Sequence, residues 1–490
     1  MNYIFRYIKN NIVGNTVIKN SFLGIISNIL QNIFFSIFFI IIARNFAAND
    51  FGNYVISNTL YSFVLSFSTL GLGNWFVREL NGTLNRELLI EKFIKIQFLL
   101  GCIFYLFLLL TVSIIYDSIE IRVLSFIIGL NLIPDNLIYV VKSIGIADIK
   151  QERAFIISTA ESIVKFLISV LLLITTISLI QLTILLIILR ITSLAAFLIY
   201  GTGRLISLKN IFNIKPDIRE LAIIIQDNWA FVVIASIAVV NWRIGNIFIS
   251  KYMTLKEVGY YEIAFKLLSI AYIIPVVVSS TIFPSLVKSI NENNSIKNYN
   301  KIHFAYTLYG FLTFTFIYSF SDKLVPLLFG SQYATVSQYC KQMFSVMLVF
   351  PSVLLQANLL IALKKEKADM YCNLISLLIN IIICTVALNF TKSISVVIFA
   401  ITSSFFIFHI IQDVVLINSK TTKILQVINF YVFTILGCLL FYFLSITLNA
   451  MVSFTLFWTL VLIAILILYK YQKQNNVSLA KYIPIMIDQK

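Results

Sequence analysis

Charged side chains are scarce in this sequence of 490 residues: Asp, Glu, Lys and Arg make up 12%, whereas 60% of the residues are hydrophobic. Ordinary soluble domains carry roughly twice that share of charge and fewer apolar residues. A soluble domain is therefore excluded as the main body of the chain. Acidic residues are fewer than basic ones: 21 Asp and Glu stand against 37 Lys and Arg, which gives a formal net charge of +16.

Cysteine is also rare, and its five positions follow no pattern. Cys102, Cys340, Cys372, Cys384 and Cys438 show none of the close spacings of metal ligands. Because only Cys340 is expected outside the cell, we expect no disulfide framework. A glycine-rich phosphate loop ending in Lys and Ser or Thr is missing too, so ATP is not expected to drive the chain directly. We therefore expect no metal and no cofactor.

What the sequence does have is long apolar runs. About 20 apolar residues cross a bilayer as a helix, which satisfies its own backbone hydrogen bonds, whereas barrel strands would be about ten residues long and alternating. We predict an all-α polytopic membrane protein with about 14 transmembrane helices. The predicted spans are 21–43, 53–76, 96–116, 122–141, 154–176, 179–200, 222–242, 260–284, 303–321, 343–363, 370–390, 394–417, 425–448 and 450–469.

The positions of Lys and Arg indicate the orientation, because cytoplasmic loops carry the excess of positive charge. With both termini inside, most of the 37 basic residues fall on cytoplasmic segments. The external segments then hold only Arg44, Arg122, Lys251, Lys256, Lys323, Lys341 and Lys392. The first span is too long to be a cleaved signal peptide, and the segment before it is expected to lie on the cytoplasmic surface. The positive charge is thus attributed to orientation and lipid attraction, not to nucleic-acid binding.

A short motif occurs twice and suggests an internal duplication. ARNFAANDFGNY, Ala43 to Tyr54, aligns without a gap with SKYMTLKEVGYY, Ser250 to Tyr261. Six spans separate the copies, so the repeats are expected to be parallel and related by an axis along the membrane normal. We predict a six-helix lobe at 1–200, a cytoplasmic linker at 201–221, a second, pseudo-symmetric six-helix lobe at 222–418, and a hairpin with a cytoplasmic tail at 419–490.

Charged residues inside the predicted spans are the candidate functional residues, because each is costly at a helix centre and is expected to face the bundle interior or a partner. Glu161 and Lys165 are spaced i,i+4 on one span, and Glu262 and Lys266 repeat this spacing on another. Both couples have an alternative interpretation as internal neutralising pairs. The full set of charges is Asp135, Glu161, Lys165, Arg190, Arg243, Glu262, Lys266 and Asp413, with Asp227 nearer the inner end of its span.

Arg190 is the strongest single candidate for an anion contact, because it has no acid on its own helix. The alternative is a structural partner such as Asp135. Arg243 comes next, since its neighbours Asn241 and Trp242 suit a polar cavity wall or a sugar-stacking surface.

A histidine and an acid in the twelfth predicted span form a candidate for ion coupling. His409 and Asp413 are spaced i,i+4, and histidine titrates near neutrality. A satisfied polar pair is the alternative. Asp135 and Glu161 are the other ion-coupling candidates.

Several stretches occur in one order along the chain: ARNFAANDFGNY with LGLGNWFVREL (Leu70 to Leu80), VGYYEIAFKLLS with FPSLVK (Phe283 to Lys288), LVPLLFGSQY (Leu324 to Tyr333) and LLIALKKEK (Leu359 to Lys367). In these stretches the chain resembles the Wzx-type polysaccharide flippases, which belong to the MATE-like multidrug/oligosaccharidyl-lipid/polysaccharide exporter superfamily. Lipid-flipping relatives place arginines on the first span, where this chain has Gln31 and Asn32 and no cation. That site cannot be carried over.

The resemblance implies a two-lobed MATE-like fold and a non-enzymatic role. It implies movement of undecaprenyl-pyrophosphate-linked oligosaccharide across a bacterial inner membrane by alternating access, for O-antigen or another surface polysaccharide. A monomer among membrane lipids is expected, with a polysaccharide polymerase and chain-length machinery as possible partners. Pyrophosphate contacts would come from Arg190 and Arg243 with Lys165 or Lys266. A cation-coupled drug exporter is one alternative, and a membrane polysaccharide polymerase is the other.

Overall fold

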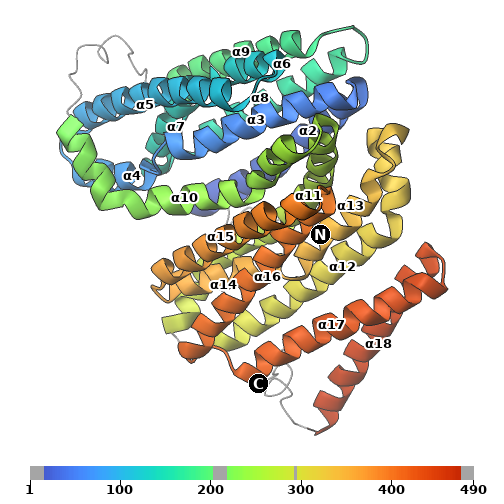
Figure 1. Ribbon diagram of the computed structural model, residues 1–490. Helices are drawn as coiled ribbons and strands as arrows, with labels where there is room; N and C mark the ends of the chain where they lie inside the picture. The colour runs from blue at the N-terminus through green and yellow to red at the C-terminus, as the bar shows by residue number, and fades with distance from the viewer. Residues whose placement is uncertain (1–15, 202–217, 292–294, 476–490) are drawn as a thin grey trace, which may run out of the picture. The chain divides into compact units, whose positions relative to one another are not determined.

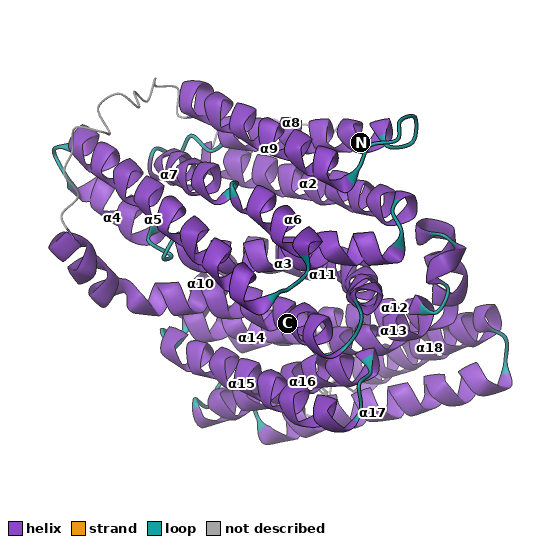
Figure 2. Ribbon diagram, turned by 45° about the horizontal axis from the view of Figure 1, so that its top comes forward, coloured by secondary structure: helices purple, strands orange, loops and turns teal. Residues whose placement is uncertain are grey.

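The computed structural model describes residues 16–201, 218–291 and 295–475, and nearly all of them are helical (Figures 1 and 2). No strand occurs in these ranges. They contain 12 helical segments that are long and apolar enough to cross a membrane, so the prediction of an all-α polytopic membrane protein is confirmed. The predicted N-terminal surface segment, most of the linker at 201–221 and the end of the C-terminal tail lie outside the described residues.

By its internal contacts the chain divides into two units, Met1–Gly259 and Tyr260–Lys490. The helices of the first unit are α2 (Thr16–Asn45), α3 (Ala48–Ser68), α4 (Gly73–Gly82), α5 (Arg86–Ile115), α6 (Ile119–Gly129), α7 (Leu132–Ala147), α8 (Glu152–Leu171), α9 (Leu179–Ala196), which a π-helical turn at Phe197–Gly201 extends, and α10 (Ile218–Tyr252). The next helix, α11 (Leu255–Asn291), begins in this unit and continues into the second.

The second unit contains the remaining helices. They are α12 (Ser295–Phe329), α13 (Val336–Met343), α14 (Phe350–Ala362), α15 (Glu366–Phe390), α16 (Ile394–Asn418), α17 (Ile424–Thr447) and α18 (Ala450–Asn475). Within this unit α15 packs against α16, and α17 and α18 form a hairpin whose helices also contact α12. The two-lobe division with an appended hairpin stays a proposal.

The 12 candidate membrane helices coincide with 12 of the 14 predicted spans. The other two predicted spans, 53–76 and 222–242, overlap α3 and α10, which are not among the 12 candidates in the described residues. In α3 the reason is visible in the sequence, because Asn53, Ser57 and Thr59 interrupt its apolar residues. All three are buried within the protein. A span count of 14 therefore stays a prediction.

Two of the membrane helices are broken just before a proline. The span Ile119–Ala147 divides into α6 and α7, with Pro134 in the first turn of α7. The span Val336–Ala362 divides at Val349, with Pro351 at the start of α14. Proline lacks the N–H that a helix interior needs, but its fixed φ suits the first turn. Each break therefore creates a helix N-terminus inside a membrane span.

The two copies of the repeated motif meet at their glycines. A Cβ added to Gly52 of α3 would lie 1.9 Å from the carbonyl oxygen of Leu255, at the start of α11. A Cβ added to Gly259 would lie 3.0 Å from the ring of Phe51. Glycine lets helix backbones approach this closely, as small residues do at helix interfaces in membranes. The first residues of α3 and α11 therefore pack directly on one another.

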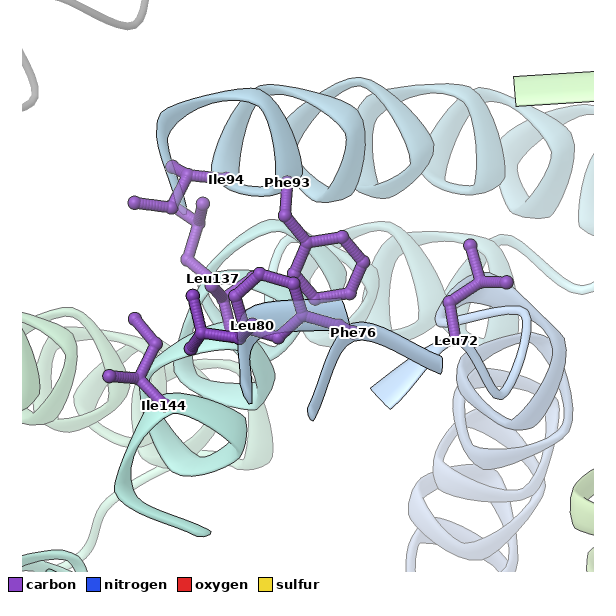
Figure 3. Packing of buried hydrophobic residues seen from close by; sticks show 8 residues of the cluster. Leu72, Phe76, Leu80, Phe93, Ile94, Leu137 and Ile144 are labelled. Carbon is purple, nitrogen blue, oxygen red and sulfur yellow. The ribbon is translucent and has the colours of Figure 1, made fainter. Parts of the chain in front are cut away.

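Each unit has its own apolar core, and much apolar surface remains outside it. In the first unit the rings of Phe76 and Phe93 stack with centroids 4.1 Å apart between α4 and α5, and Leu137 of α7 completes the cluster (Figure 3). By contrast, Ile114 is 82% exposed and Phe443 is 64% exposed. Apolar faces of this kind suit contact with lipid.

Candidate functional site

The charged residues within the spans of the first unit converge into one cluster. Asp135 comes from α7, Glu161 and Lys165 from α8, and Arg190 from α9. The carboxyl side chains of Asp135 and Glu161 are only 6% exposed, whereas the side chain of Arg190 is 22% exposed and that of Lys165 is 32% exposed. We call these four residues the charged cluster.

Arg190 bridges the two acids of the charged cluster. Its Nη1 donates to Glu161 Oε2 over 2.7 Å, and its guanidinium also donates to Asp135 Oδ1. The planar guanidinium fork can hold two carboxylates at once, which a lysine cannot do as well. The structural partner considered from the sequence is thus present, and Glu161 is a second one. Both acids thus have a cationic partner, where a buried carboxylate without one would be costly.

The local fold explains why Asp135 can be placed so deep. It lies in the first turn of α7, directly after Pro134, at the break between α6 and α7. A helix N-terminus carries partial positive charge and unpaired N–H groups, which favour a carboxylate. Tyr61 of α3 donates its hydroxyl proton to Asp135 Oδ2. Asp135 is therefore held by two elements besides its own, α3 and α9.

Lys165 connects the charged cluster to a cavity. Its Nζ lies 2.8 Å from Glu161 Oε1, so the predicted i,i+4 couple is paired. The side chain also lines a cavity of about 260 Å³ between α2 and α8. The other lining residues are Asn28, Gln31, Asn32, Phe35 and Ser162. The cavity wall thus combines one cation with amide and hydroxyl groups.

The arrangement supplies a cation at the position where the first span has none. Gln31 and Asn32 of α2 line the cavity, and Lys165 reaches the same cavity from α8. Hydrogen bonds fix the two helices against each other, since Ser27 Oγ lies 2.8 Å from Thr159 Oγ1 and Gln31 donates to Ser27 over 2.6 Å. The cation of this chain therefore comes from α8 and not from α2.

The charge balance around the cavity is positive. Asp135 and Glu161 offset Lys165 and Arg190, and Lys142 of α7 is close enough to interact electrostatically with all four. The Nζ atom of Lys142 lies 5.4 Å from the centroid of the Phe197 ring. With three cations and two acids, the site carries a formal charge of +1. Such a site suits an anionic, hydrogen-bonding ligand.

The other predicted residues lie on different helices. Arg243 is half-buried on α10, where Asn241 is buried and Trp242 is half-buried. Glu262 and Lys266 are both buried on α11. Their roles in substrate contact stay proposals.

His409 and Asp413 of α16 meet in the second unit. His409 Nδ1 lies 3.0 Å from Asp413 Oδ2, and Gln356 of α14 donates to Asp413 Oδ1 over 2.7 Å. Tyr431 of α17 contacts both residues of the pair.

Sequence reasoning missed the uncharged members of both groups. Tyr61 and Tyr431 are two of 24 tyrosines, and Gln356 lies in an apolar stretch. No local pattern distinguishes them, because their partners are distant in the sequence.

Solved structures with the same fold are membrane transporters. A lipid II flippase MurJ in an inward closed conformation matches with a TM-score of 0.69 and 15% identity, covering 89% of this chain and 97% of that one. An inward-facing MATE multidrug resistance transporter of the MOP superfamily matches with a TM-score of 0.64 and 8% identity, covering 80% and 96%. A MOP superfamily transporter from Pyrococcus furiosus matches with a TM-score of 0.56 and 10% identity, covering 83% and 96%.

The MATE-like fold expected from the resemblance is therefore confirmed. No curated protein matches the sequence. A family model described as polysaccharide biosynthesis protein matches residues 41–338, which is more than half of the chain. The chain belongs to this polysaccharide biosynthesis protein family.

Proposed function

We propose that the chain is a flippase that moves undecaprenyl-pyrophosphate-linked oligosaccharide from the cytoplasmic to the outer leaflet of a bacterial inner membrane. The family and the fold are those of transporters and flippases, which support this role over catalysis. The observation that carries the proposal is the cavity at Lys165, which joins a cation to amide and hydroxyl groups. Both termini would be cytoplasmic, and the product would serve O-antigen or capsule-type synthesis.

The cavity chemistry fits the headgroup of such a substrate. A pyrophosphate cannot leave water without cations and donors to replace its hydration. Lys165 offers the cation, while Asn28, Gln31 and Asn32 offer amides that can bond to phosphate or to sugar hydroxyls. Phe35 adds a ring face for stacking on a sugar. Lys165 replaces Arg190 as our first candidate, because Arg190 is occupied by two acids.

A second feature fits the lipid part of the substrate. In the second unit, a groove of about 320 Å³ is lined almost wholly by apolar side chains of α12, α17 and α18. Phe311, Leu440, Phe457 and Ala464 are among them. The tail already lies in hydrocarbon, so the groove would hold it by van der Waals packing and not by the hydrophobic effect. We call this the apolar groove and propose it as a seat for the undecaprenyl tail.

Transport would proceed by alternating access. MATE transporters with this fold have been solved in inward-facing and outward-facing conformations. A carrier that exposes one polar cavity to each leaflet in turn avoids drawing the headgroup through hydrocarbon. The chain would act as a monomer and deliver its product to a polymerase and chain-length machinery.

Deleting the gene tests the proposal. We expect full repeat units on undecaprenyl pyrophosphate to accumulate in the cytoplasmic leaflet, with surface polysaccharide lost and restored by the wild-type gene. Single units that reach the outside and stay unpolymerised would identify a polymerase instead. Unchanged polysaccharide with increased sensitivity to cationic dyes would identify a drug exporter.

A further inference from the structure

A buried acid in the second unit differs from the acids of the charged cluster, because no Lys or Arg within the described residues pairs with it. Asp413 is 4% exposed, and its partners in the described part of the chain are Gln356, Tyr431 and His409. Asp135 and Glu161, by contrast, each pair with Arg190. Only Asp413 therefore depends on a histidine for neutralisation.

We propose that His409 and Asp413 together bind one proton, and that this proton holds α17 against α16. With a neutral imidazole the pair carries a charge of −1, which is costly for a group buried in a membrane protein. One added proton makes the pair neutral, and a second would leave it positive and equally costly. Because the two groups are in direct contact, the proton belongs to the pair and not to either residue alone.

The contacts of His409 leave one ring nitrogen for proton exchange. Nδ1 lies 2.6 Å from the hydroxyl of Tyr431 and 3.0 Å from Asp413 Oδ2. Nε2 has no hydrogen-bond partner in the described residues. Because His409 is only 1% exposed, bulk water does not reach this atom either. A histidine in this state can accept a proton at Nε2 while Nδ1 stays engaged.

A small polar cavity lies next to this nitrogen. It measures about 20 Å³ and is lined by His409, Asp413, Thr422, Gln426 and Asn300, among others. Thr422 Oγ1 is a second buried atom without a partner in the described residues. A cavity of this size holds one water molecule when polar atoms are available to bind it. Thr422 lies in the turn between α16 and α17. A water molecule bound there would connect Nε2 to the end of these helices, where a proton could enter.

The titratable groups around the pair are few. α12 contributes Tyr299 and His303. The ring centroid of His303 lies 6.3 Å from that of His409. From α15 comes Asp369, which accepts a 2.8 Å bond from Gln412. α17 contributes Tyr431, and α14 faces Asp413 with the uncharged Gln356. None of these groups is a lysine or arginine that could replace the proton.

The pair also connects to the apolar groove. The ring of Phe430 stacks on that of His409, with centroids 4.8 Å apart, and Phe430 and His303 line both the groove and the polar cavity. Protonation that fixes Tyr431 and Phe430 thus fixes one wall of the groove. That this proton gates or drives transport rests on the proposed function, whereas proton binding itself does not.

The chain has only two histidines, so protonation of His409 can be followed in the NMR signals of its imidazole ring. We would label the histidines of the full-length protein with ¹⁵N, record the imidazole signals against pH without substrate, and assign His303 with a His303→Asn variant. Asp413→Asn should weaken proton binding at His409 at least about tenfold, because an opposite charge in contact is lost. Asp369→Asn is the matched control, since it removes a buried acid that has an amide partner but no histidine, and should change proton binding far less. An equal effect of both variants, or none in Asp413→Asn, would overturn the assignment.

A second measurement guards against misfolding of Asp413→Asn. In His409→Gln the carboxyl must carry the proton itself, so infrared spectra should gain the band of a buried protonated carboxyl. This band should vanish in the His409→Gln/Asp413→Asn double variant. A missing band, or one that persists in the double variant, would overturn the proposal. Because neither spectrum requires substrate, both results stand whether or not the protein proves to be a flippase.

Discussion

Lys165 Nζ lies 2.8 Å from Glu161 Oε1, one helical turn away on α8. The other oxygen of the same carboxylate accepts a 2.7 Å bond from Arg190. Glu161 therefore has two cationic partners, and it shares one of them, Arg190, with Asp135. A substrate anion can bind Lys165 while Arg190 continues to hold both acids and Lys142 supplies the second positive charge, so ligand binding need not leave the two acids unbalanced.

Replacing Lys165 by Ala should reduce transport about 10- to 100-fold, which corresponds to one lost bond to a charged group. Protein abundance should stay normal, because Glu161 keeps Arg190 and the two remaining cations, Arg190 and Lys142, still match the two acids. Lys165→Arg should restore part of the activity. Transport of lipid-linked oligosaccharide into the outer leaflet of proteoliposomes measures the effect. Lys150→Ala, which removes an exposed lysine between α7 and α8, is the control. If both variants transport equally well, Lys165 does not bind the substrate.

Replacing Arg190 by Ala should act first on folding. Asp135 and Glu161 would both lose a buried partner, at a cost of about 3–5 kcal/mol for breaking such a pair. We expect the protein level in membranes to fall sharply and to recover in the Asp135→Asn/Glu161→Gln/Arg190→Ala triple variant, where neither buried carboxylate is left without its arginine. An Arg190→Ala protein present at normal level but inactive would instead make Arg190 a direct substrate contact.

The sequence was sufficient for the fold and for part of the site. Apolar runs of about 20 residues have few other outcomes than membrane helices, and the i,i+4 spacing of Glu161 and Lys165 predicted their pairing. The contact of Arg190 with both Asp135 and Glu161 could not be predicted in full, because it depends on how α7, α8 and α9 rotate about their axes. The cavity shared by α2 and α8 depends on the same rotations.

The repeated motif illustrates the same limit. Its alignment predicted a duplication, but not that Gly52 would lie against the backbone of Leu255. Such a contact depends on how two helices pack. The spacing of residues within each helix does not predict it. The choice of Arg190 as the first anion contact had a related weakness, since its partners lie on other helices.

Replacing Gly52 by Ala should destabilise the protein. The new methyl group would lie 1.9 Å from the Leu255 carbonyl oxygen, so the starts of α3 and α11 must separate. Overpacking of this kind costs about 1–3 kcal/mol. Thermal unfolding of the purified protein measures the loss. Gly82→Ala is the control, because a Cβ there meets no atom within 4 Å, and similar melting of both variants would contradict the tight contact.

Filling the apolar groove should prevent tail binding without unfolding the protein. Ala464 of α18 lines the groove, so Ala464→Trp would place a large ring where the chain is proposed to lie. Undecaprenyl phosphate should raise the melting temperature of the wild type by binding the folded state, and this gain should disappear in Ala464→Trp. Ile467→Trp, one turn along the same helix at a residue that is 62% exposed and outside the groove, should keep it. If Ala464→Trp gains as much stability from the lipid as Ile467→Trp does, the tail binds elsewhere, because a groove blocked by tryptophan cannot hold it.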